Sequence, residues 1–181
     1  IMTHHFISSP VASLLGDISV PGDKSISHRA IMLGAIANGT TTIQGFLEAD
    51  DCLATLHAFE SLGVSIEKPD ENSLIIHGVG KHGLQKPLKN IDCGNSGTSM
   101  RLLAGILAAQ SFDSELTGDG SLMTRPMERI RRPLLQMGAD VMAQDGKPPL
   151  IIRGNQTLQG ITYAMPEASA QVKSCLLLAG L

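Results

Sequence analysis

Residues 19–37 read SVPGDKSISHRAIMLGAIA, and the same layout returns as NIDCGNSGTSMRLLAGILAA at residues 90–109 and as TYAMPEASAQVKSCLLLAGL at residues 162–181. In each copy we expect an apolar strand, a short glycine- or serine-bearing turn and a helix with one cation early in it. The cations recur 72 residues apart at both steps, as Arg29, Arg101 and Lys173. Helix starts leave backbone N–H groups unpaired and carry the positive end of the helix dipole, so they attract phosphate and carboxylate. The sequence therefore predicts three equivalent sites for small anions.

The repeat continues beyond these helices. Each full copy adds a strand and an amphipathic helix, over residues 50–63 in the first copy and 127–138 in the second. A strand pair follows, and its second strand reads LIIHG at residues 74–78 and LIIRG at residues 150–154. Each unit is thus β-α-β-α-β-β, and units of this length need neighbours to bury their faces.

We divide the chain into an opening segment, residues 1–20, and repeats over 21–90, 91–158 and 159–181. The first helix of each repeat is apolar nearly all round, which is typical of a buried helix. We therefore expect an α/β fold in which these helices form a central bundle, with sheets outside and the helix starts at one end. The third repeat stops inside its first helix. We infer that the chain is the front part of a longer protein; the alternative is a complete small domain with a C-terminal helix.

Composition excludes several classes of function. The formal net charge is −3, and neither a basic stripe for nucleic acid nor a charge pattern for anionic membranes is present. Cys52, Cys93 and Cys175 are odd in number and lack metal-ligand spacing, so we expect no disulfide framework and no metal site. No apolar run approaches the ~20 residues that span a bilayer, and no secretory leader pattern is present. A reducing cytoplasm is the compartment that we expect.

The sharpest polar segment is PGDKSISHR, residues 21–29. Ser25 offers a hydroxyl at the helix start beside Lys24, and Arg29 can reach back over the turn because helical side chains lean toward the N-terminus. An anion site and a merely capped helix, with Asp23 pairing Lys24, are about equally supported by these residues.

Three further segments carry weaker signals. The loop CGNSGT at residues 93–98 lets a ligand approach the backbone, although such strings are more often plain loops. Arg125 precedes a helix-opening proline, although most loop arginines are simply solvated. Ser169 opens the third helix and is first of all an N-cap. We expect His28 to be a satisfied or solvent-facing histidine, and Arg129 to lie on a solvated helix face.

Taken together, PGDKSISHRA, CGNSGTSMRLLAG, LTGDGSLMTRPM and ASAQVKS resemble the 5-enolpyruvylshikimate-3-phosphate (EPSP) synthase family, in particular its bacterial class II branch. The likeness runs from about Ser19 to Leu181, with the motifs in the family's order. The related UDP-N-acetylglucosamine enolpyruvyl transferases carry a different first motif and a reactive cysteine loop, and neither is found here.

The resemblance implies a two-lobed fold in which each lobe contains three β-α-β-α-β-β units, an arrangement like an inverse α/β barrel. Residues 1–20 would begin the first lobe, and residues 21–181 would build two units of the second lobe and start its third. The family's proton-transfer groups would lie in the lobe that this chain lacks. The chain alone would therefore show little or no turnover.

The resemblance also implies the activity: transfer of the enolpyruvyl group of phosphoenolpyruvate to the 5-hydroxyl of shikimate 3-phosphate, with release of phosphate. It implies no cofactor, no metal, a monomeric full-length enzyme, and inhibition by glyphosate because Gly97 leaves space that an alanine would fill. Residue by residue, it implies the following roles: Lys24 and Arg125 contact phosphoenolpyruvate; Ser25, Arg29, Ser169, Ala170 and Gln171 hold shikimate 3-phosphate; Asn95, Gly97 and Thr98 form the wall; and Arg101 positions the loop. The competing hypothesis is a non-catalytic anion-binding or assembly domain of the same architecture.

Overall fold

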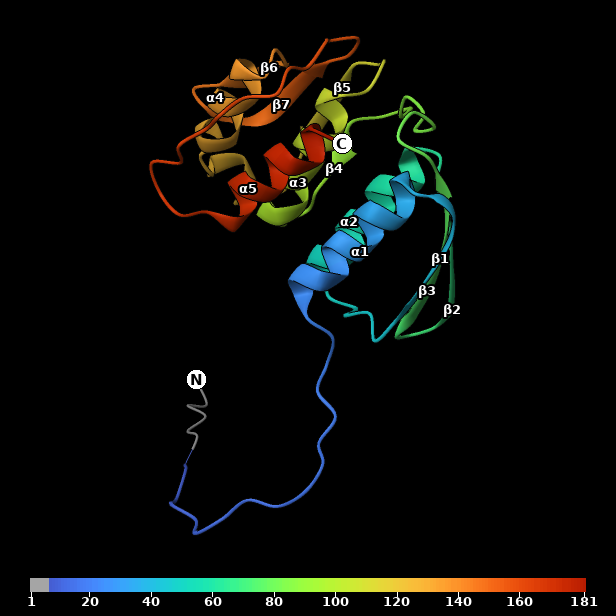
Figure 1. Ribbon diagram of the computed structural model, residues 1–181, viewed down its shortest axis with the longest axis vertical. Helices are drawn as coiled ribbons and strands as arrows, with labels where there is room; N and C mark the ends of the chain where they lie inside the picture. The colour runs from blue at the N-terminus through green and yellow to red at the C-terminus, as the bar shows by residue number, and fades with distance from the viewer. Residues whose placement is uncertain (1–6) are drawn as a thin grey trace.

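The computed structural model describes residues 7–181, and residues 1–6 of the opening segment lie outside the described residues. The first repeat contains α1 (Lys24–Ile36), β1 (Asn38–Gln44), α2 (Asp50–Ser61), β2 (Ser65–Asp70) and β3 (Ser73–Val79). The remainder contains β4 (Ile91–Asp92), α3 (Gly97–Ala108), β5 (Ser114–Thr117), the short 3-10 helix η1 (Leu122–Thr124), α4 (Glu128–Gln136), β6 (Asp140–Gln144), β7 (Lys147–Arg153) and α5 (Ala170–Ala179). The expected α/β class is confirmed (Figure 1).

The strands form two small sheets, in the orders β1-β3-β2 and β4-β5-β7-β6. All pairs are antiparallel except β4 with β5. The two repeated LII motifs explain how each sheet faces the core. Leu74 and Ile76 are buried in β3, and Leu150 and Ile152 are buried in β7, because alternate strand residues point to the same face. Each repeat therefore packs its helices on one side of its own sheet.

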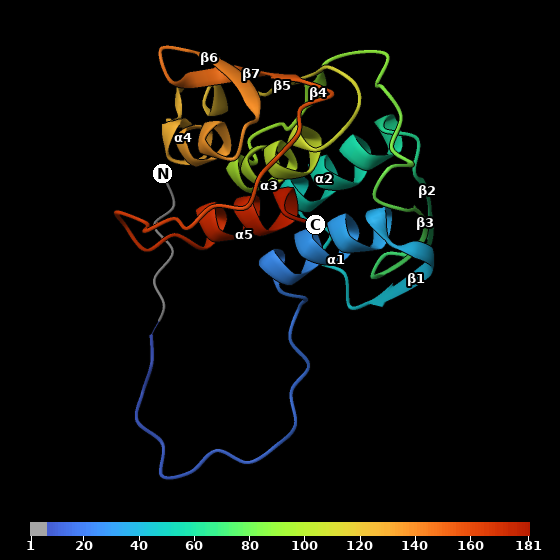
Figure 2. The ribbon, with the colours of Figure 1, turned by 45° about the horizontal axis from the view of Figure 1, so that its top comes forward.

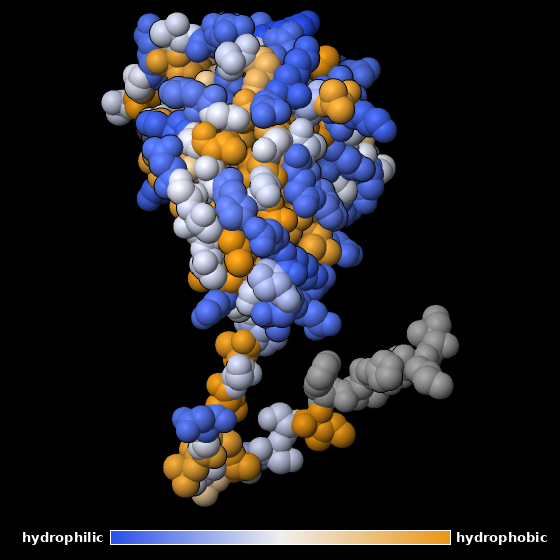
Figure 3. Space-filling model, turned by 90° about the vertical axis from the view of Figure 1, so that its right-hand side faces the viewer, coloured by the Kyte–Doolittle hydropathy of each residue, from blue (hydrophilic) through white to orange (hydrophobic). Residues whose placement is uncertain are grey.

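The opening strand expected in every repeat is found only in the second, where β4 pairs with β5. Residues 7–23 and 154–169 contain neither helix nor strand. A strand needs a partner for its backbone N–H and C=O groups, and neither segment pairs with a strand of the two described sheets. Figure 3 shows the first of them projecting away from the body of the fold, with exposed apolar side chains at Ile7, Val11, Leu14, Leu15, Ile18 and Val20.

The three repeated helices run in a similar direction, with their first turns toward the same side of the molecule (Figure 2). Burial all round is confirmed for α3, which packs against α2, α4, α5 and two strands. It is wrong for α1 and α5, since Leu33 is 50% exposed and Leu177 is 64% exposed. Only α3 has neighbours on every side, so the same apolar pattern gives different burial in the three copies.

Helices α3 and α5 approach each other closely at Gly105. A Cβ atom built on Gly105 would lie 2.2 Å from the carbonyl oxygen of Cys175, which is well inside van der Waals contact. Cys175, Cys52 and Cys93 are free thiols with fully buried side chains. Burial raises the pKa of Cys93 and of Cys175 to about 12, so these thiols stay protonated.

A buried chain of hydrogen bonds joins the first turns of α1, α2 and α3. His28 Nδ1 lies 2.7 Å from Thr55 Oγ1, which lies 2.6 Å from Ser99 Oγ. Ser99 Oγ lies 2.7 Å from Ser96 Oγ, the N-cap oxygen of α3. His28 is fully buried and its Nε2 has no partner among the described residues, so the expectation of a satisfied or solvent-facing ring is wrong. Burial lowers the pKa of His28 to about 4, and the nearby Asp51 only partly opposes this.

We expect Gly105→Ala to destabilise the chain by about 1–3 kcal/mol, because two helix backbones must separate to admit the methyl group. Alanine is the better helix former by only about 1 kcal/mol, which does not offset that clash. Thermal unfolding of the 181-residue chain measures the change, and Gly120→Ala is the control because its added Cβ meets nothing within 4 Å. Equal melting temperatures for the two variants would contradict the close approach.

The buried His28 ring predicts a loss of stability in mild acid. The folded chain holds the ring neutral down to about pH 4, whereas the unfolded chain takes up its proton below the ordinary value of 6.5. The contribution of the neutral His28 ring to the free energy of unfolding is therefore complete above pH 6.5. It declines by about 2–3 kcal/mol as the pH falls to about 4. Denaturant unfolding between pH 7.5 and 4.5 should show a shallower decline for His28→Asn. Replacing His57, which is exposed on α2, should leave the slope unchanged.

Candidate functional site

Each of the three repeated helices is capped by a side chain. Asp23 accepts a hydrogen bond from Ile26 N at 2.8 Å, Ser96 from Ser99 N at 3.1 Å, and Ser169 from Val172 N at 3.3 Å. The prediction that Ser169 is an N-cap is confirmed. Each cap satisfies one of the orphan N–H groups, and the dipole of the helix start remains.

Lys24 is the first residue of α1, and its Nζ lies 3.1 Å from Asp51 Oδ2 on α2. Asp23, which pairs with Lys24 in the alternative of a merely capped helix, accepts from Ile26 N and caps α1. The ammonium group is about half exposed, and exposed pairs of this kind contribute only about 0–1 kcal/mol. An incoming anion can therefore compete with Asp51 for Lys24.

Arg29 reaches back over the first turn of α1, as expected from the direction of helical side chains. It donates to Ser25 O at 3.0 Å and to Ser174 Oγ on α5 at 2.7 Å. The hydroxyl of Ser25 lies in an exposed residue at the same helix start. Arg29 thus ties the start of α1 to α5, and Ser174 is a partner that the sequence analysis did not identify.

Arg101 is a buried cation, only 5% exposed. Its guanidinium group donates to Gln171 Oε1 at 2.9 Å, to Pro126 O at 3.2 Å and to Gly97 O at 3.4 Å. Burial, together with the smaller effects of the neighbouring cations Arg129 and Arg125, lowers the pKa of Arg101 to about 10. The group remains charged at neutral pH and binds the backbone of both surrounding loops.

Gln171 connects three helices through its amide. Its Oε1 accepts from Arg101 on α3 and, at 3.4 Å, from Arg129 on α4, and its Nε2 donates to Thr98 Oγ1 at 3.0 Å. Arg129 was expected on a solvated face; it is exposed, but it turns toward Gln171. The expected exposure of Arg129 is confirmed, and its contact with Gln171 was not predicted because the position of α5 beside α4 could not be inferred from the charge run in α4.

Arg125 follows η1, and its Nη2 donates to Asn95 Oδ1 and, more weakly at 3.4 Å, to Ser121 Oγ. Gly97 lies between this arginine and Arg101. A Cβ atom there would be 2.7 Å from Arg101 Nη1 and 3.2 Å from Arg125 Nη1. Because Gly97 has no side chain, both guanidinium groups can occupy positions that a Cβ atom would obstruct.

The predicted residues form two groups that Arg29 and α5 connect. One lies at the start of α1 (Lys24, Ser25, Arg29), and the other surrounds Gln171 (Asn95, Gly97, Thr98, Arg101, Arg125). Ser169 and the exposed Ala170 stand at the start of α5, whereas Lys173 is exposed and makes none of these contacts. Within residues 7–181, no carboxylate lies within 4.0 Å of the four arginines of the site: Arg29, Arg101, Arg125 and Arg129. The arrangement can attract and orient anions.

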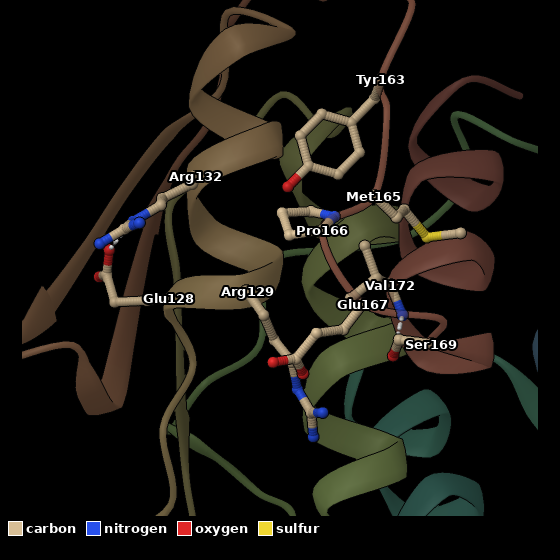
Figure 4. Close-up of a pocket in the computed structure, with 9 residues that line it drawn as sticks. All are labelled: Glu128, Arg129, Arg132, Tyr163, Met165, Pro166, Glu167, Ser169 and Val172. Atoms are coloured by element: carbon tan, nitrogen blue, oxygen red, sulfur yellow. Dashed lines mark hydrogen bonds and ion pairs between the residues drawn. The ribbon is translucent and has the colours of Figure 1, made fainter.

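A cavity of about 280 Å³ borders this cluster between α4, residues 163–169 and the start of α5 (Figure 4). Tyr163, Met165 and Pro166 form its apolar side, and Arg129 and Ser169 connect it with the arginine cluster. Neither Lys24 nor Arg125 lines this cavity. The cavity therefore lies beside the residues predicted to contact phosphoenolpyruvate and does not include them. Among residues 7–181 no group of three His, Cys, Asp or Glu residues is placed to hold a metal ion, and none of the helices there has the length and apolarity needed to cross a bilayer.

Comparison with known proteins identifies the family. A family model described as EPSP synthase (3-phosphoshikimate 1-carboxyvinyltransferase) matches residues 9–181. The 3-phosphoshikimate 1-carboxyvinyltransferase of Legionella pneumophila strain Philadelphia 1 is 70% identical over 177 residues, which are 98% of this chain and 41% of that protein. The enzyme of the same name from Methylococcus capsulatus is 60% identical over 97% of this chain and 40% of its own length.

A solved structure of EPSP synthase from Acinetobacter baumannii superimposes with a TM-score of 0.89 at 60% identity. The match covers 92% of this chain and 38% of that one, so the chain spans about two fifths of the length of the proteins that it matches. The similarity in sequence and in structure agrees with the motifs at the three helix starts, and this chain belongs to the EPSP synthase family.

Proposed function

We propose that this chain provides one side of the active site of a 3-phosphoshikimate 1-carboxyvinyltransferase, which moves the enolpyruvyl group of phosphoenolpyruvate to the 5-hydroxyl of shikimate 3-phosphate and releases phosphate. The observation that carries the proposal is that the four arginines of the site, on α1, on α3, before α4 and in α4, have no carboxylate within 4.0 Å among residues 7–181. Both substrates are anionic, and preorganised cations and helix starts stabilise such charges in a water-poor site.

In this proposal Lys24 and Arg125 contact phosphoenolpyruvate. Lys24 exchanges the Asp51 carboxylate for a substrate oxygen, which costs little because the pair is partly exposed. Arg125 offers a planar fork to a carboxylate or a phosphate. Asn95, Gly97 and Thr98 form the adjoining wall of the phosphoenolpyruvate site. Arg101 holds this wall in position through its hydrogen bond to Gly97 O.

In the same proposal shikimate 3-phosphate is held by Ser25, Arg29, Ser169 and Gln171, with the backbone of Ala170 at the start of α5. The reaction requires protonation of the CH₂ carbon of the enol double bond and attack by the 5-hydroxyl, which gives up its proton and forms a tetrahedral intermediate. Loss of phosphate together with one proton of the new methyl group then restores the double bond. The residues of this chain bind and orient the two anions, and the proton-transfer groups are proposed to lie in the other lobe. The chain alone is therefore expected to bind weakly and not to turn over, and its three free thiols suit a reducing cytoplasm.

A chimaera in which this chain replaces the matching part of the Legionella pneumophila relative tests the proposal. We expect phosphate release from the chimaera, and a fall in kcat/KM of at least about 100-fold when Lys24→Ala and Arg125→Ala are combined, because two charge-assisted contacts are lost. Lys173→Ala is the matched control, since Lys173 is exposed on α5 outside the contacts of the site. A non-catalytic assembly domain would be indifferent to the paired substitution.

Gly97→Ala should weaken inhibition of the same chimaera by glyphosate, with a smaller rise in KM for phosphoenolpyruvate. The new methyl group would displace the guanidinium ends of Arg101 and Arg125, which lie 2.7 Å and 3.2 Å from its position. Inhibition constants measured for both forms check this, with Gly160→Ala as a control at a position where a Cβ meets nothing. Equal inhibition of the two forms would refute the proposed crowding.

A further inference from the structure

Asp119 lies in the Gly-Asp-Gly turn before η1, and no role in the proposed reaction has been given to it. Its Oδ1 accepts from Leu122 N at 2.7 Å, and its Oδ2 accepts from Asn95 Nδ2 at 2.7 Å. Its own backbone N donates to Gly94 O at 2.9 Å. Asp119 is therefore bonded at both ends to the loop that carries Asn95.

These contacts fix which way the Asn95 amide faces. An ionised carboxylate only accepts hydrogen bonds, so the NH₂ group of Asn95 must face Asp119. The amide oxygen is then turned to Arg125, whose Nη2 lies 2.5 Å away. The hydrogen bond from Asn95, followed by that from Leu122 N, lowers the pKa of Asp119, so the carboxylate stays ionised at neutral pH.

The neutral amide also separates two opposite charges. Arg125 gains a directional acceptor in Asn95 Oδ1, while the Asp119 carboxylate contacts the Nδ2 end of the same amide. A direct pair elsewhere in the fold provides the contrast: Arg153 Nη1 lies 2.6 Å from Asp113 Oδ2, and its charge is locally compensated. Arg125 is thus oriented by Asp119 without being neutralised by it.

We propose that Asp119 is a positioning residue, which acts through Asn95 to hold Arg125 ready for the anionic substrate. The inference rests on the proposed role of Arg125 in binding phosphoenolpyruvate. Asp119 itself does not touch the substrate.

Asp119→Asn is the sharpest test because it preserves shape. Leu122 N and Asn95 contact different oxygens of the Asp119 carboxylate, and an asparagine replaces one of these oxygens by an NH₂ donor. If the remaining oxygen keeps the bond from Leu122 N, the new NH₂ group faces Asn95, and the Asn95 amide turns and presents a donor to Arg125. In the chimaera we expect KM for phosphoenolpyruvate to rise about tenfold while kcat changes less than about threefold. Asp113→Asn is the matched control, since Asp113 also accepts from one backbone N–H and one side chain but lies outside the site.

Asn95→Asp separates orientation from charge. A carboxylate at this position would pair directly with Arg125, so we expect a larger rise in KM than for Asp119→Asn. In the double variant the amide introduced at position 119 can donate to the carboxylate introduced at position 95, and this carboxylate still contacts Arg125. The charge of Arg125 is then neutralised, so we expect KM for phosphoenolpyruvate to stay high. Recovery of the unsubstituted KM in the double variant would overturn the need for a neutral spacer.

Side-chain amide signals of Asn95 in the 181-residue chain give a readout independent of turnover. In ¹H–¹⁵N spectra they should shift in the Asp119→Asn chain and not in the Asp113→Asn chain. Unchanged signals would overturn the contact, and shifted signals with unchanged KM would overturn the positioning role. An unsubstituted chimaera without turnover would contradict the proposed function instead, and the amide signals would still decide whether Asp119 orients Asn95.

Discussion

The buried guanidinium group of Arg101 is the interaction on which the site depends. Removing a charged group from water costs several kcal/mol unless polar partners replace the solvent. Here the partners are oxygens from three separate places: Gly97 at the start of α3, Pro126 ahead of α4, and Gln171 on α5. Because none is a carboxylate, Arg101 fixes the three segments relative to one another and still adds a positive charge beneath the cluster.

The chain of hydroxyls from His28 to Ser96 complements this arrangement from the other side of α3. Arg101 ties α3 to the loop ahead of α4 and to α5, whereas the hydroxyl chain ties the first turn of α3 to α1 and α2. Between them lies the loop of Asn95 and Gly97, whose backbone has little freedom once both ends are held. Rigid support of this kind keeps cations in place without carboxylates that would cancel their charge.

Local signals in the sequence predicted the parts of the fold that depend on neighbours close in the chain. The helix starts follow from capping residues such as Ser169, and the inward faces of β3 and β7 follow from the repeated LII motif. Features that depend on distant neighbours were not predictable in this way. The opening strands need a sheet edge to pair with, and the exposure of Leu177 depends on what packs against α5.

The site shows the same division. Lys24, Arg29 and Arg125 were identified from turn chemistry and from a family resemblance. The structure places Lys24 and Arg29 at the start of α1, and Arg125 against Asn95 in the loop that leads into α3. The pairing of Lys24 with Asp51, the turn of Arg129 toward Gln171 and the half-satisfied ring of His28 each join residues far apart in sequence. No spacing rule within a single sequence encodes such contacts.

The three buried cysteines have a consequence for how opening of the fold could be followed. Alkylating reagents attack the thiolate, so a thiol that is both enclosed and protonated reacts only while its surroundings are transiently open. Cys52 belongs to α2, Cys93 precedes α3 and Cys175 belongs to α5, so each reports on a different part of the chain. Their relative labelling rates would rank the local unfolding of these parts without any probe being introduced.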